Sequence, residues 1–148
     1  VGDRAPAFQV LSQELTPVAL SDATGKALLI SVVPSVDTPV CDAQTRRFNQ
    51  EAAKLPAGVE LWTISMDLPF AQKRWCGAAG IDRVKLLSDH REASFGTAFG
   101  TLVKELRLLA RAIFVVDAQG IIRYVEYVRE VTTPPNYDAA LAAVHKIA

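Results

Sequence analysis

One stretch of the sequence, residues 27–48, constrains the fold more than any other. Residues 27–33 are mostly apolar and rich in β-branched side chains, and Pro34 ends the run, so they predict a fully buried strand. A helix is expected to follow soon after. Thr38 is a good N-cap, and Pro39 falls at the first helical position, where its missing N–H costs nothing. The stretch therefore predicts a strand that leads directly into a helix.

Cys41 lies in the first turn of this predicted helix, which spans 39–54. Many cysteines are simply small buried apolar residues, and this alternative stays open for Cys41. The nucleophilic form of cysteine is the thiolate, and a helix N-terminus stabilises a negative charge by only about 0.3–1 kcal/mol. A reactive Cys41 therefore needs a nearby cation as well. The apolar stripe that packs this helix on a sheet is Cys41, Thr45, Phe48, Ala52 and Leu55.

The rest of the chain alternates strands and helices and then ends in a hairpin and a helix. With 148 residues and no repeat or linker, the sequence predicts one domain, 1–148. The alternation predicts an α/β protein with a thioredoxin-like fold, in which helices flank a central mixed sheet. The expected elements are short β pieces in 1–20 broken by Pro6 and Pro17, strands at 59–65 and 84–87, helices at 69–76 (capped by Gly77) and 92–99, a hairpin of 111–117 and 121–128, and a closing helix at 137–147 with Leu141 and Val144 inward.

Composition excludes several classes of function. Sixteen basic residues balance sixteen acidic ones, which leaves no electrostatic footprint for nucleic acid or an anionic membrane. The sequence has no apolar run long enough to predict a membrane span, and no signal peptide is recognised. The two cysteines form no CxxC pair, and His90 and His145 are far apart, so the sequence gives no support for a metal site.

Three segments resemble one protein family. They are PSVDTPVCDAQTRRFNQEAAKL at 34–55, SMDLPFAQKRWCGAAGI at 65–81 and LSDHREASFG at 87–96. The first contains the P-x-x-x-T-x-x-C pattern of the peroxiredoxins, and the other two are similar to the thiol peroxidase branch, of the atypical two-cysteine type. The match is in register over essentially the whole chain. Family members also carry a short N-terminal hairpin, which we expect to precede residue 1 and which this sequence does not include.

The resemblance implies roles for five residues. Cys41 would be the peroxidatic cysteine and Cys76 the resolving cysteine, which form an intramolecular disulfide after Cys41 reacts with hydrogen peroxide or an organic hydroperoxide. Arg111 would supply the cation, Thr38 a hydrogen bond to thiolate and peroxide, and Pro34 a shield against water. From the residues alone, Cys76 could equally be a packing residue at a helix end. The resemblance also implies thioredoxin as reductant, a homodimer, a bacterial cytoplasmic setting and a reaction that needs no metal or organic cofactor.

Other interpretations remain at this point. Arg46, Arg47 and Arg107 are alternative cations, and Met66 and Phe70 are candidate apolar residues at the mouth of the site, although burial in the core is the stronger expectation for both. Cys41 and Arg47 also match the C-x5-R spacing of tyrosine phosphatases, but the intervening DAQTR lacks the glycine that such a phosphate loop needs. A non-catalytic redox sensor or thioredoxin-fold binding module would use the same two cysteines.

Overall fold

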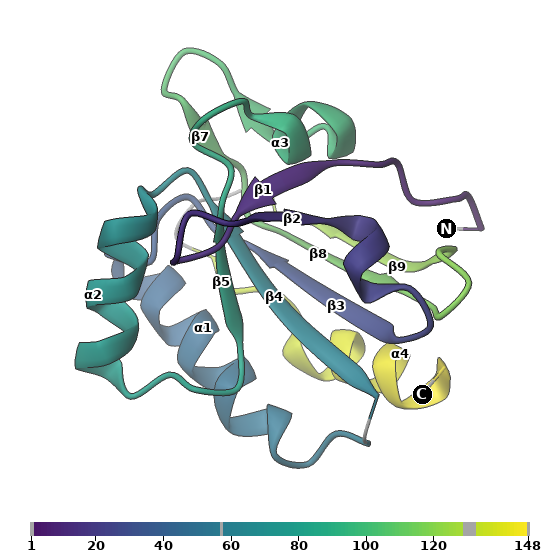
Figure 1. The fold of residues 1–148 in the computed structure, drawn as a ribbon. Helices are drawn as coiled ribbons and strands as arrows, with labels where there is room; N and C mark the ends of the chain where they lie inside the picture. The colour runs from purple at the N-terminus through teal and green to yellow at the C-terminus, as the bar shows by residue number, and fades with distance from the viewer. Residues whose placement is uncertain (1, 57, 129–132, 148) are drawn as a thin grey trace.

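The computed structural model describes residues 2–56, 58–128 and 133–147, and Figure 1 shows their arrangement. The described residues form a seven-stranded sheet in the order β2-β1-β5-β4-β3-β8-β9. The three strands at its centre, β3, β4 and β5, are parallel, and the flanking strands are antiparallel. The predicted α/β class with a mixed central sheet is therefore confirmed. The strand bounds are β1 Gln9–Leu11, β2 Pro17–Ala19, β3 Ala27–Val32, β4 Val59–Ser65, β5 Lys85–Ser88, β8 Ala112–Val116 and β9 Ile122–Tyr127.

Helices and loops cover both faces of this sheet, so its central strands are apolar on both sides (Figure 1). Leu29 and Leu61 face α1, α2 and α4, whereas Leu28 and Trp62 face α3 and the N-terminal segment around Phe8, as the period of two requires. The helical bounds are η1 Leu20–Ala23, α1 Pro39–Ala52, α2 Pro69–Ala79, α3 Ser94–Phe99 and α4 Tyr137–Ile147, and a small hairpin pairs β6 Leu102–Val103 with β7 Leu108–Leu109.

Most predicted elements are present within one or two residues. All six residues of β3 are buried, β8 and β9 form the predicted hairpin, and α4 has Leu141 and Val144 inward. We expected Pro17 to break a strand. Instead it begins β2 at the edge of the sheet, where a residue without an N–H is tolerated.

Two helix ends differ from the prediction. Gly77 does not cap α2, because the helix continues to Ala79 and Gly80 takes the left-handed conformation (φ 71°) that ends it. Cys76 is therefore inside α2 rather than at its end. Helix α3 begins at Ser94 rather than at 92, because Ala93 has a left-handed backbone (φ 52°).

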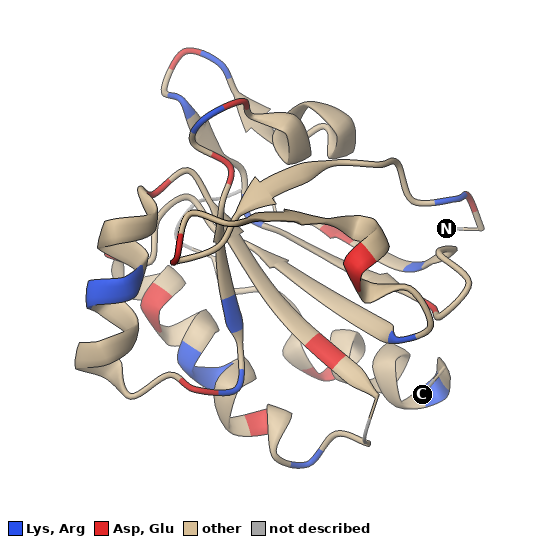
Figure 2. Cartoon of the chain, in the orientation of Figure 1, with Lys and Arg blue, Asp and Glu red and all other residues tan. Residues whose placement is uncertain are grey.

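Charged residues of both signs are interspersed over the part of the chain drawn in colour in Figure 2. On α1, for example, Asp42 pairs with Arg46 and Arg47 pairs with Glu51. Among the described residues, no helix is long and apolar enough to cross a membrane.

Candidate active site

Cys41 lies in the first turn of α1, as predicted. Thr38 occupies the N-cap position with extended backbone angles (φ −113°, ψ 151°), and its carbonyl accepts the Asp42 N–H at 2.8 Å. Its hydroxyl, however, makes no cap hydrogen bond. The Thr38 Oγ1 instead donates to the Ser35 carbonyl at 2.9 Å, because the loop at 34–38 turns back on itself. Thr38 therefore starts the helix through its backbone while its side chain stabilises the preceding loop.

The Cys41 thiol is fully buried in an apolar environment. Its exposed fraction is 0%, and it belongs to a cluster that includes Val33, Val36 and Phe48. Pro34, two residues after the end of β3, is buried too. The Thr45 hydroxyl donates to the Cys41 carbonyl at 2.9 Å, one turn along the helix. An anion formed on Cys41 would be poorly hydrated here and would depend on protein groups for stabilisation.

Arg111 is a buried cation at the same end of the sheet. It directly precedes β8, whose Ala112 is paired with Val32 at the end of β3, and only 2% of the arginine is exposed. Its Nη1 donates to the Gln44 Oε1 at 2.8 Å, and the Gln44 Nε2 donates to the Ser31 Oγ at 2.6 Å. Gln44 thus joins β3, β8 and the helix that carries Cys41.

The competing cations are more exposed than Arg111. Arg46 is exposed, pairs with Asp42 and stacks on Trp75, with its guanidinium carbon 5.6 Å from the ring centroid. Arg47 is half-buried and pairs with Glu51, and Arg107 is exposed in a turn with φ 53°. Burial distinguishes Arg111 from these three, because only 2% of Arg111 is exposed.

Tyr137, the first residue of α4, also belongs to this site. Its ring packs edge-on against Phe48 at 5.4 Å, and Arg47 lies over it at 4.9 Å. Burial raises the pKa of Tyr137, while the charges of Arg111 and Arg47 oppose that shift and Cys41 adds to it. The neutral phenol is therefore the form present near physiological pH.

Gln44 and Tyr137 are the two site residues that the sequence reasoning missed. For Gln44 the signal was present: it follows Cys41 by three positions, so it falls on the buried stripe of the helix beside Thr45. A polar amide on such a stripe needs a buried partner. For Tyr137 the sequence holds no comparable signal, because its position follows from where α4 packs.

Cys76 is the second buried thiol of the same apolar cluster. It lies in α2 with an exposed fraction of 8%, and both cysteines are free. The Gln13 Nε2 donates to the Cys76 Sγ at 3.3 Å. Burial raises the pKa of the Cys76 thiol, and the Gln13 hydrogen bond lowers it by a smaller amount.

The residues next to the two cysteines are joined directly. The Trp75 Nε1 donates to the Asp42 Oδ2 at 2.9 Å, so α2 is attached to the first turn of α1. A disulfide needs Cα atoms within about 7 Å and two correctly oriented Cβ atoms. With each cysteine inside a regular helix, the redox change implied by the resemblance would require this region to rearrange.

The described residues form neither the phosphate loop of a tyrosine phosphatase nor a cluster of metal ligands. Residues 41–47 are all within α1, so their N–H groups point along a helix instead of converging on a phosphate. His90 and His145 are both exposed. In the described parts of the chain, no group of three or more His, Cys, Asp or Glu residues is placed to hold a metal ion.

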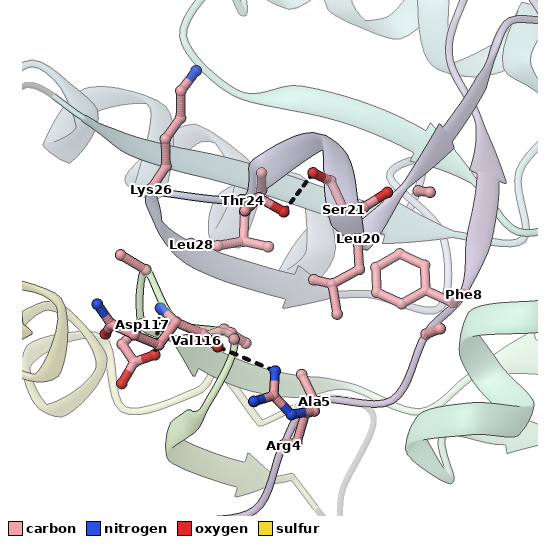
Figure 3. Close-up of a pocket in the computed structure, with 16 residues that line it drawn as sticks. Arg4, Ala5, Phe8, Leu20, Ser21, Thr24, Lys26, Leu28, Val116 and Asp117 are labelled. Carbon is pink, nitrogen blue, oxygen red and sulfur yellow. Dashed lines mark hydrogen bonds between the residues drawn. The ribbon is translucent and has the colours of Figure 1, made fainter.

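Two cavities lie at opposite ends of the sheet. The one in Figure 3, about 360 Å³, is lined by residues at the start of β3 and the end of β8, such as Lys26, Leu28 and Asp117, and so lies away from Cys41. The other, an open groove of about 750 Å³, lies between the loop before α1 and helix α2 and is lined by Val36 and Phe70. Met66, the other candidate mouth residue, is buried in the core with Trp62, Ile64 and Phe95 instead.

Comparisons with known proteins agree with one another. The family described as Redoxin matches residues 1–141. The chain is 61% identical to a thiol peroxidase of Bacillus subtilis over 143 residues (97% of this chain, 85% of the relative) and 59% identical to one of Staphylococcus aureus over 146 residues (99% and 88%). A crystal structure of a peroxiredoxin-like protein from Aquifex aeolicus has a TM-score of 0.93 at 40% identity, covering 100% of this chain and 87% of that one. A thiol peroxidase from Chromobacterium violaceum shares the fold, with a TM-score of 0.87 at 23% identity, over 98% and 85% of the two chains.

Proposed function

Because the chain belongs to the thiol peroxidase branch of the peroxiredoxin family, and is therefore an enzyme that reduces peroxides at the expense of thiols, we propose that Cys41 carries the reaction and Cys76 completes it. The observation that carries this assignment is the buried Arg111, held by Gln44 on the helix of Cys41. Hydrogen peroxide and organic hydroperoxides are the proposed substrates.

In the first step the Cys41 thiolate attacks the terminal oxygen of the hydroperoxide. The O–O bond breaks, the sulfur takes up one oxygen as a sulfenic acid, and the remaining alkoxide or hydroxide gains a proton and leaves as alcohol or water. The N-terminus of α1 and Arg111 stabilise the thiolate, and Arg111 also stabilises the negative charge that develops on the leaving oxygen. Pro34 excludes water, and Thr38 lies at the start of the same helix to contact the peroxide.

In the second step the Cys76 thiolate attacks the sulfenic sulfur and forms the Cys41–Cys76 disulfide, and the displaced hydroxide takes up a proton and leaves as water. Two observations support this pairing: both cysteines belong to one apolar cluster, and the Trp75–Asp42 hydrogen bond joins α2 to the first turn of α1. A dithiol protein reduces the disulfide, and we propose thioredoxin. The proposed reaction requires no metal or organic cofactor.

The proposal extends to the setting of the protein. Residues 1–148 form one peroxiredoxin domain, which acts as a homodimer in the bacterial cytoplasm. Binding of nucleic acid or membrane has no part in it. The balanced, interspersed charges support the proposal that the protein binds neither nucleic acid nor membrane (Figure 2).

Intact-mass measurement after one equivalent of hydrogen peroxide tests the assignment. We expect the reduced wild type to lose two hydrogens, the Cys76→Ser variant to gain one oxygen, and the Cys41→Ser variant to stay unchanged over seconds. If the wild type stays unmodified, Cys41 is an ordinary buried thiol and the assignment is wrong. Repeated peroxide turnover with a thiol donor is expected of the enzyme. A non-catalytic redox sensor would be oxidised only once.

A further inference from the structure

The carboxylate of Asp67 holds the loop that precedes Cys41. Asp67 lies between the end of β4 and the start of α2, and its Oδ1 accepts the Ser35 Oγ–H at 2.7 Å. Its Oδ2 accepts the Val36 backbone N–H at 2.9 Å and the Ser65 hydroxyl at 2.7 Å. Three donors thus converge on one carboxylate, and two of them belong to the loop at 34–38.

Ser35 transmits this attachment to Thr38. The Ser35 carbonyl accepts the Thr38 hydroxyl at 2.9 Å and the Thr38 N–H at 3.3 Å. Because a hydroxyl has one proton and two lone pairs, a Thr38 hydroxyl that donates to Ser35 can only accept further hydrogen bonds. Its lone pairs therefore remain available to accept the O–H of a hydroperoxide.

We propose that Asp67 is a positioning residue for peroxide attack, which acts through Ser35 to hold the Thr38 hydroxyl in the orientation that accepts a hydrogen bond from the substrate. This inference rests on the proposed function of Cys41 and Thr38. The Asp67 carboxylate accepts hydrogen bonds from Ser35, Val36 and Ser65 and from neither cysteine, so its effect is confined to the formation of the sulfenic acid.

Position 67 needs a side chain with two hydrogen-bond acceptors, because three donors point at the Asp67 carboxylate. In Asp67→Asn only one oxygen remains to accept hydrogen bonds. The new NH2 group faces either the Val36 N–H, which can only donate, or a serine hydroxyl, which must reorient to accept. The loop loses at least one of its attachments while the side chain keeps its size. We expect the second-order rate constant for sulfenic acid formation to fall about tenfold, since small displacements of a contacting group reduce rates strongly.

The test measures sulfenic acid formation with hydrogen peroxide in a Cys76→Ser background, where no disulfide can follow. Asp67→Asn and Ser35→Ala are each introduced into two proteins, one that keeps Thr38 and one that carries Thr38→Val. We expect either substitution to slow the reaction when Thr38 is present, and to change it less than twofold when Thr38 is replaced by valine. That loss of effect is a signature which general destabilisation would not produce.

Asp117→Asn is the matched control. Asp117 also accepts several hydrogen bonds, from the backbone of Gln119 and Ile121 and from Arg123, but it lies at the hairpin end of the sheet. This substitution should leave the rate unchanged. An Asp67→Asn variant with the wild-type rate, or a tenfold loss that persists in the Thr38→Val background, overturns the inference. If Asp67→Asn does not fold, Ser35→Ala decides the matter alone. Failure of the parent Cys76→Ser protein to gain oxygen would instead refute the proposed function.

Discussion

Gln44 shows how one side chain sets the geometry of this site. The amide has a donor end and an acceptor end, and the structure uses both, toward Ser31 and toward Arg111. A buried guanidinium without such a partner would carry a large desolvation cost. The Gln44 amide is neutral, so this hydrogen bond does not itself reduce the positive charge of Arg111. A glutamate in the same place would neutralise much of that charge.

Cys76 is a residue whose protonation limits its own step. Its thiolate is the attacking group, and burial holds the pKa of the thiol above its usual range while the Gln13 hydrogen bond partly offsets that effect. In Gln13→Leu the pKa of Cys76 rises further, so we expect disulfide formation at pH 7 to slow about threefold. The deficit should shrink as pH rises and more thiolate forms in both proteins.

Rapid quenching and mass analysis of the disulfide at pH 7 and pH 9 measures this effect. Gln9→Leu, an exposed glutamine on β1, serves as the control and should behave as wild type. Equal slowing at both pH values would mean that Gln13 acts through packing rather than through the thiol.

At the scale of the elements, α1 and α2 are joined beside the two cysteines. The Trp75–Asp42 hydrogen bond and the stacking of Arg46 on Trp75 attach the cysteine-bearing part of α2 to the first turn of α1. Each supporting contact favours the arrangement in which both thiols are free. Disulfide formation has to disrupt this attachment wherever α2 unwinds, so the attachment should slow the second step and not the first.

Trp75→Phe removes the indole N–H and keeps an aromatic ring against Arg46. A hydrogen bond contributes about 0.5–1.5 kcal/mol, so its loss should speed disulfide formation about threefold. Sulfenic acid formation in the Cys76→Ser background should not change. Trp62→Phe, in the core on the other face of the sheet, is the matched control.

Stopped-flow kinetics with hydrogen peroxide and hydrogen exchange of the reduced protein measure the result together. We expect faster exchange in α2 of the Trp75→Phe protein than in the wild type. An unchanged rate of disulfide formation would show that α2 rearranges without releasing Trp75.

At the scale of the whole molecule, the two ends of the sheet have separate tasks. Cys41, Gln44 and Arg111 gather where β3 ends and β8 begins. The opposite end holds the β8–β9 turn and the cavity of Figure 3, and there the charged groups serve the fold. Stability and catalysis are therefore open to independent tests.

Asp117 provides the stability test. Burial alone would raise its pKa, but hydrogen bonds from Ile121, Arg123 and Gln119 together lower it. Because the folded pKa lies below the unfolded value of about 3.9, the ionised group stabilises the fold above that pH, and this contribution is lost as pH falls through the folded pKa. Asp117→Asn should lower the free energy of unfolding at pH 7 by about 1–2 kcal/mol.

Urea unfolding at pH 7 and at pH 3 gives the two free energies. The difference between wild type and Asp117→Asn should narrow at the lower pH. A constant difference would assign the loss to geometry and not to the charge. Peroxidase activity of the folded variant should match that of the wild type.

The sequence by itself determined the elements and the placement of Cys41. A β-branched run closed by Pro34, a Thr-Pro helix start and a hairpin signal are local patterns, whose physical causes act within a few residues of the chain. They predicted β3, α1, the β8–β9 hairpin and α4 within a residue or two. Helix α2 was placed too short, because Gly77 and Gly80 are both plausible ends and only packing selects between them.

Only the tertiary structure decided which side chains meet. Gln44 contacts Arg111 across 67 positions, Gln13 contacts Cys76 across 63, and Ser35 contacts Asp67 across 32. Local propensity carries no information at those separations. The order of the strands brings these residues together. Burial makes the Gln44–Arg111 hydrogen bond necessary, because a polar group removed from water must find a partner inside the protein.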